Sequence, residues 1–125
     1  MSKIKKVVRE DGKVAIIISP GYGAGWSTWV NSDAEQALFD PEIVAWILAG
    51  KPVVHTPQDG DSTFVTNWAK EYGNQAREWA EKYGYLGGLG DAVIAWVSPG
   101  IPFRVNEYDG YESVVAHDDD DWVVA

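Results

Sequence analysis

Short apolar runs alternate with polar turns along the chain, and this pattern predicts strands and short helices. Residues 3–9 and 13–19 are expected to form two strands joined through Asp11-Gly12, a dipeptide that favours a tight hairpin with a type I′ turn. Three consecutive isoleucines, residues 16–18, predict that the second strand is covered on both faces. Pro20 ends this strand because proline has no N–H for a sheet ladder.

Two short helices are predicted in the middle of the chain. Ser32 and Glu35 have the spacing of a capping box, so we expect the first helix to begin at Ser32 and to run through Leu38. Asp40 followed by proline is a typical start for the second helix, with aspartate at the N-cap. Gly50 is expected to end that helix just past its last turn.

A single long helix is predicted over residues 63–83. Its apolar positions recur at steps of three and four residues and therefore share one face. These positions are Val65, Trp68, Tyr72, Ala76, Trp79 and Tyr83. Gly73 lies inside this segment and weakens the helix by about 1 kcal/mol relative to alanine.

The last third of the chain predicts strands at residues 92–97, 102–108 and 111–116, and residues 123–124 are a candidate edge strand. Asp109-Gly110 is a second hairpin signal, and a two-residue turn there places Glu107 opposite Glu112 if the register fits. The expected fold is α+β in one domain, residues 1–125. We expect a mainly antiparallel sheet of four to six strands with two short helices and one long helix packed on it.

The segment 20–29 combines three alternating glycines with aromatic residues, directly after a predicted strand. It has neither the Gly-x-Gly-x-x-Gly pattern of dinucleotide sites nor the Gly-Lys-Ser/Thr of a Walker A loop. Two interpretations remain: the segment is a structural plug that covers the core, or it is a loop that binds a ligand. We expect Trp26 and Trp29 to cover the sheet, and Tyr22 and Ser27 to be candidates for outward contacts.

The net charge of −9 is unevenly distributed. Residues 1–13 carry +3 and the remainder carries −12, with no basic residue after Arg104. Such a surface repels nucleic acid and anionic membranes and attracts basic protein surfaces, although solubility alone is the other explanation. The candidate partner-binding carboxylates are Glu107, Asp109, Glu112, Asp118, Asp119, Asp120 and Asp121.

Catalytic and metal chemistry has little support in the sequence. There are no cysteines and only two histidines, His55 and His117, and no Gly-x-Ser-x-Gly elbow is present. The run of four aspartates lacks the ligand spacing of a calcium-binding EF-hand and is more typical of a solvated turn. We therefore expect a protein that is not an enzyme, with no metal and no cofactor.

Three motifs together resemble a group of small, mostly uncharacterised proteins of bacteriophages. They are GYGAGWSTW at residues 21–29, FDPEIV at 39–44 and FRVNEYDGYES at 103–113. The resemblance spans most of the chain between Val14 and Val114, and it carries no catalytic residues. It implies a phage product in the cytoplasm of a bacterial host, where small acidic proteins often inhibit host enzymes.

Charge and resemblance together lead to one main hypothesis and one alternative. The main hypothesis is an inhibitor that mimics DNA and binds the DNA-contacting surface of a host nucleic-acid enzyme, such as DNA gyrase or another topoisomerase, or a defence nuclease. It predicts no direct contact with nucleic acid or with a membrane. The alternative is a protein that binds a small molecule or nucleotide derivative through residues 21–29, with Tyr22, Ser27 and Arg104 as contacts.

Overall fold

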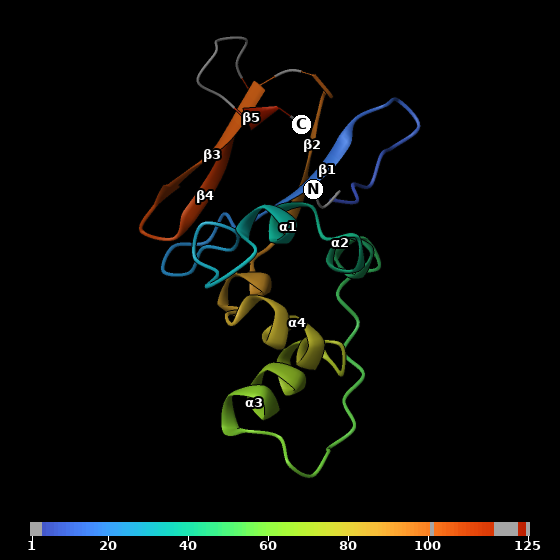
Figure 1. Ribbon diagram of the computed structural model, residues 1–125, viewed down its shortest axis with the longest axis vertical. Helices are drawn as coiled ribbons and strands as arrows, with labels where there is room; N and C mark the ends of the chain where they lie inside the picture. Colours follow the sequence, from blue (N-terminus) through green and yellow to red (C-terminus); the bar gives the residue numbers. More distant parts are fainter. Residues whose placement is uncertain (1–3, 101, 117–122, 125) are drawn as a thin grey trace.

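The structure, a computed structural model, describes residues 4–100, 102–116 and 123–124, and its architecture is α+β (Figure 1). The helices are α1 (Ala34–Phe39), α2 (Pro41–Leu48), α3 (Thr63–Tyr72) and α4 (Ala76–Tyr83), followed by a 3₁₀ turn, Gly87–Gly90. The strands are β1 (Val14–Ile18), β2 (Val93–Val97), β3 (Pro102–Tyr108), β4 (Tyr111–Ala116) and β5 (Val123–Val124). No helix in the described part of the chain is both long and apolar enough to span a membrane.

The strands form two antiparallel sheets, so the expectation of one sheet of four to six strands is wrong. One sheet pairs β1 with β2, and the other has the order β4-β3-β5, which confirms the expected edge strand at 123–124. The two sheets meet where the Glu112 N–H donates to the carbonyl of Ser19, at 2.7 Å. Pro20 follows directly and the chain turns away into the glycine-rich segment, so the ladder does not continue.

The two predicted hairpins differ in their turns. Asp109 and Gly110 both have positive φ, +50° and +86°, which confirms a type I′ turn between β3 and β4. At the first hairpin only Gly12 has positive φ, and the Arg9 N–H donates to the carbonyl of Lys13. This is a three-residue loop with a bulge, and residues 4–9 contribute a single bridge, Val8 to Val14, in place of the predicted strand.

The predicted start of the first helix is wrong and that of the second is right. Ser32 donates its hydroxyl to the carbonyl of Lys82 at 2.8 Å, and Asp33 becomes the N-cap residue with φ of +54°. Asp40 caps α2, where its carboxylate accepts hydrogen bonds from the N–H groups of the next turn. Gly50 then ends this helix, with φ of +90°, in the double hydrogen-bond pattern of a Schellman motif.

The predicted long helix is two helices, α3 and α4, which break at Gly73 with φ of +94°. Arg77 stabilises the connection between the two helices. Its guanidinium donates hydrogen bonds to Asp61 at 2.9 Å, to Asn74 at 2.8 Å and to the carbonyl of Thr56 at 2.9 Å. The apolar face was predicted correctly for its second half: Tyr72, Ala76, Trp79 and Tyr83 are all buried. The pairing of α3 against α4 therefore replaces a straight helix.

Strand β1 is buried on both faces, as the isoleucine run predicts. Ala15 and Ile17 join the larger core cluster, which the helices and Trp26 complete. Val14 and Ile16 point into a second cluster, which contains residues of α1 and β3. β1 thus contacts α1 and α2 and also β4, and in Figure 1 it lies beside β2, to the right of the β3–β4 hairpin.

Tyr83 connects the two ends of the helical region. Its buried hydroxyl donates to Asp40, whose carboxylate also lies 3.7 Å from the ammonium of Lys82. Burial, and then the hydrogen bond to Asp40, raise the pKa of Tyr83 above its usual range. Burial also raises the pKa of Tyr72.

These tyrosines predict a loss of stability in alkali. An unfolded tyrosine loses its proton near pH 10, whereas folded Tyr83 keeps it, so the unfolding free energy falls as pH rises above about 10. Each such group contributes a slope of about 1.4 kcal/mol per pH unit. Urea unfolding at pH 8 to 11 gives the unfolding free energy at each pH. This free energy should fall less steeply with pH for Tyr83→Phe than for the unmodified protein, and exposed Tyr108→Phe is the control. Equal slopes for Tyr83→Phe and the unmodified protein would contradict this.

Candidate functional site

The side chain of Glu112 organises the glycine-rich segment. Its carboxylate is fully buried and accepts hydrogen bonds from the N–H groups of Ser19 at 2.9 Å, Trp26 at 2.8 Å and Thr28 at 3.1 Å. The Thr28 hydroxyl adds a fourth bond at 2.6 Å. Three backbone donors and one hydroxyl converge on one anion, which is the arrangement of a backbone anion site. The chain therefore fills its own anion site.

This arrangement explains why the segment resembles a phosphate-binding loop and lacks the motifs of one. Ser19 donates its hydroxyl to the carbonyl of Ala24 at 2.9 Å, which folds the segment back over the end of β1. Gly88 lies so close beneath it that an added Cβ would be 2.1 Å from the carbonyl oxygen of Gly25. With Glu112 in place, the donors are used and a negative charge occupies the centre, so a phosphate is repelled from this position.

The two tryptophans of the segment have different roles. Trp26 is fully buried, donates its indole N–H to the carbonyl of Ala37 at 2.8 Å, and packs edge-on against Tyr83. This confirms the plug expected for Trp26. Trp29 is 38% exposed and donates its indole N–H to Glu107 at 3.2 Å, so it lies at the rim of the loop.

Only some of the carboxylates predicted to bind a partner are exposed at the surface. Glu107 and Asp109 are exposed near the end of the β3–β4 hairpin. Glu107 and Glu112 face each other in the β3–β4 register, as the turn predicts, but Glu112 points inward. Its assignment to an exposed partner-binding surface is therefore wrong, because its carboxylate is held by the loop. Asp118–Asp121 lie outside the described residues.

A signal for the burial of Glu112 existed in the sequence. Strand alternation places Glu112 on the same face of β4 as Val114, which packs against the second core cluster. The glycine-rich segment also presents backbone N–H groups that need acceptors once they are buried. An inward-facing carboxylate opposite such a segment is a natural acceptor.

The alternative ligand residues are brought together in part. Ser27 and Arg104 line one hollow of about 490 Å³ between the loop, α1 and β3, together with Glu35. Leu38, Phe103 and Val105 form its apolar walls with Ala34. Ser27 is mostly buried, in contrast to the outward position expected for it. Tyr22 does not line this hollow, and its ring packs on Tyr111 with the centroids 4.9 Å apart.

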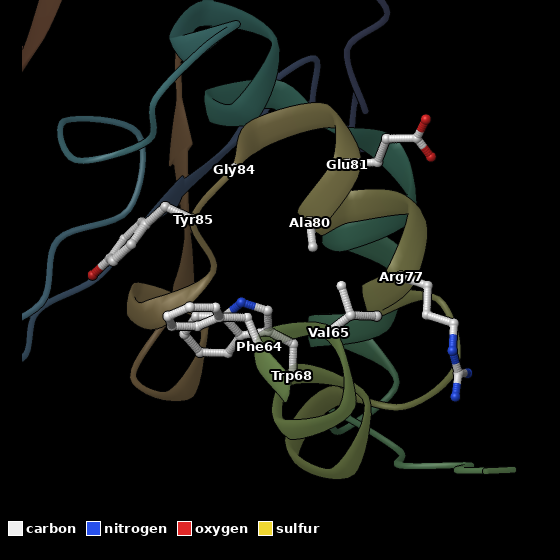
Figure 2. A pocket seen from close by; sticks show the side chains of 8 residues that line it. All are labelled: Phe64, Val65, Trp68, Arg77, Ala80, Glu81, Gly84 and Tyr85. Atoms are coloured by element: carbon white, nitrogen blue, oxygen red, sulfur yellow. The ribbon is translucent and has the colours of Figure 1, made fainter. Parts of the chain in front are cut away.

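Two further features depend on helix packing and carry no sequence motif. Three exposed carboxylates, Glu42, Glu78 and Glu81, surround a hollow between α2 and α4 beside Lys82. An apolar hollow of about 490 Å³ also lies between α3 and α4 (Figure 2). It is lined by Phe64, Val65, Trp68, Arg77, Ala80, Glu81, Gly84 and Tyr85, and the charged ends of Arg77 and Glu81 point away from it.

Within residues 4–100, 102–116 and 123–124, no three histidine or acidic side chains are placed to hold a metal ion. His55 lies in the connector between α2 and α3, and its Nε2 is buried without a hydrogen-bond partner. His117 lies outside the described residues.

The fold and this loop define an α+β protein whose glycine-rich segment is fixed by an internal carboxylate. No protein-family model, curated protein or solved structure matches this chain.

Proposed function

We propose that the protein is a non-enzymatic inhibitor that binds the basic, DNA-contacting surface of a host nucleic-acid enzyme. The proposal is carried by the net charge of −9 together with the exposed carboxylates at the turn end of the β3–β4 hairpin. DNA presents closely spaced negative charges, and a rigid acidic surface is able to compete for the same basic groups. The resemblance to phage proteins supports a host target such as DNA gyrase, another topoisomerase or a defence nuclease.

The exposure of each carboxylate decides which residues we include in this proposal. Glu107 and Asp109 remain as exposed carboxylates, and Glu112 is withdrawn from the surface. Glu42, Glu78 and Glu81 add a second group of exposed carboxylates on the helices. The four tail aspartates stay part of the proposal as predicted from the sequence.

The test is capture of bacterial DNA-binding enzymes on the immobilised protein, followed by elution with salt or with duplex DNA. We expect a topoisomerase, polymerase or nuclease to be captured and released by both, because the contacts are electrostatic. Asp109→Asn removes one charge and keeps the turn, since asparagine tolerates positive φ. Replacement of all four residues Asp118–Asp121 by asparagine tests the contribution of the tail to binding.

Two outcomes would count against the proposal. One is the absence of any nucleic-acid enzyme among the captured proteins. The other is an enzyme that duplex DNA does not displace, or that is retained equally when Asp109 and Asp118–Asp121 are all Asn.

A second candidate function is binding of a small molecule in the hollow between Ser27 and Arg104. The observation that favours it is that these residues come from the loop and from β3 and line one hollow with apolar walls. Its volume of about 490 Å³ is in the usual range of small-molecule sites. A thermal-shift screen with nucleotides and other metabolites tests it, and the absence of any shift would remove its support.

A further inference from the structure

Three tyrosines lie at the turn end of the β3–β4 hairpin. Tyr108 and Tyr111 are directly paired across the strands and flank the Asp109-Gly110 turn. Paired residues share one face of the sheet, and this face is opposite to the one that carries Glu107 and Glu112. Tyr22 reaches this face from the glycine-rich segment and packs on Tyr111. We call Tyr22, Tyr108 and Tyr111 the tyrosine strip.

The tyrosine strip is accessible. Tyr108 is 77% exposed, Tyr22 is 69% exposed and Tyr111 is 37% exposed. Exposed aromatic side chains grouped in one place are more typical of an interaction surface than of a surface without a partner. Burial does not explain why these rings are present.

The backbone that carries the strip is fastened by hydrogen bonds. The N–H of Gly23 donates to the carbonyl of Asp109 at 2.6 Å, which fastens the tip of the glycine-rich segment to the turn. The Glu107 carboxylate accepts the N–H of Gly110 at 2.7 Å and so closes the turn. A rigid support reduces the conformational entropy that binding would otherwise cost.

The chemistry around the strip favours a cationic partner group. Asp109 is exposed in the turn between Tyr108 and Tyr111, whereas Glu107 precedes Tyr108 on β3 and lies on the opposite face. Aromatic faces attract cations, and neighbouring carboxylates strengthen the attraction. Arg104 lies four residues before Tyr108 on the same face, which places it roughly 13 Å along the strand, beyond the screening length at physiological salt.

We infer that the tyrosine strip is a contact surface for arginine side chains of a protein partner. Arginine fits because its planar guanidinium stacks on aromatic rings and also bonds to carboxylates. The inference deepens the proposed function and rests on it for the kind of partner. It places the aromatic contact on the solvent face of the hairpin, next to Asp109 in the turn.

An octa-arginine peptide is the probe for this surface. We expect Tyr22→Ala and Tyr108→Ala each to weaken its binding about fivefold, because each substitution removes one aromatic face. Tyr108→Phe keeps the ring and should stay within about twofold of the unmodified protein. Phe64→Ala is the matched control, since Phe64 is 76% exposed on α3 and lies outside the strip. The tail aspartates are unchanged in all variants, so the differences report the strip.

Several results would overturn the inference. One is octa-arginine binding to Tyr108→Ala at the strength of Phe64→Ala, and another is equal loss in Tyr108→Phe and Tyr108→Ala. Self-association of the protein without peptide, abolished by Tyr108→Ala, would assign the strip to a second copy of the chain. Far-ultraviolet circular dichroism on each variant establishes that it is folded.

The two proposals fail separately. If Tyr22→Ala and Tyr108→Ala weaken octa-arginine binding but no DNA-binding enzyme is captured, the inference about the strip is supported and the proposed function is contradicted. If an enzyme is captured and displaced by DNA while both tyrosine variants bind octa-arginine normally, only the inference about the strip is contradicted.

Discussion

Glu112→Gln should lower the unfolding free energy by about 2 to 4 kcal/mol, although it changes only one oxygen to an NH₂ group. One carboxylate oxygen accepts the Ser19 N–H, and the other accepts both Trp26 and Thr28. A glutamine amide has only one oxygen, so at least one buried N–H loses its acceptor in either orientation. Urea unfolding monitored by tryptophan fluorescence measures the loss.

Glu107→Gln is the matched control for this substitution. Glu107 faces Glu112 across the hairpin, but it is exposed, and a single oxygen accepts both of its hydrogen bonds, from Trp29 and Gly110. A glutamine oxygen is able to take that position, so we expect a change of less than about 1 kcal/mol. Equal destabilisation by the two substitutions would show that Glu112 is no more than an ordinary strand residue.

Gly110→Ala should be the most damaging of the simple glycine substitutions in the turns. Gly110 has φ of +86°, and an added Cβ would lie 2.3 Å from the backbone nitrogen of Ala24. The methyl group therefore adds a backbone clash to the cost of left-handed geometry, together about 2 to 4 kcal/mol. The expected result is a lower midpoint of urea unfolding and a loosened glycine-rich segment.

Gly100→Ala separates the two contributions to this effect. Gly100 has a similar φ of +80°, and an added Cβ would meet nothing within 4 Å. Only the backbone term of about 1 to 2 kcal/mol should remain. If Gly100→Ala destabilises the protein as much as Gly110→Ala, the close approach of the segment to the hairpin does not matter for stability.

Local sequence chemistry was sufficient for some elements and not for others. The Asp109-Gly110 turn and the alternation of apolar residues predict β3 and β4 with their observed bounds, and Asp40 with Pro41 predicts the start of α2. These features depend on neighbours within a few residues. The division of the residue 63–83 segment was missed, because a single Gly73 is compatible with a helix until the tertiary packing of α3 on α4 is known.

The candidate site shows the same limit more strongly. A glutamate in an acidic stretch is usually exposed, so Glu112 reads as part of a charged surface. Its burial depends on Ser19, Trp26 and Thr28, which precede it by 84 to 93 residues. The position of the tyrosine strip depends on a similar distant contact, between Tyr22 and Tyr111. Strand alternation indicates that Glu112 faces inward, but no local pattern identifies the distant partners of Glu112 or of Tyr111.

The distance in sequence between the glycine-rich segment and Glu112 also has a consequence for the order of folding. The segment is made early in synthesis, and its acceptor is made only after most of the chain. β1 likewise cannot form its sheet until β2 has been synthesised, since Val14 pairs with Val97. Contacts so distant in sequence form slowly because a long loop must close first. The N-terminal third is therefore expected to become ordered late, when the β3–β4 hairpin is complete.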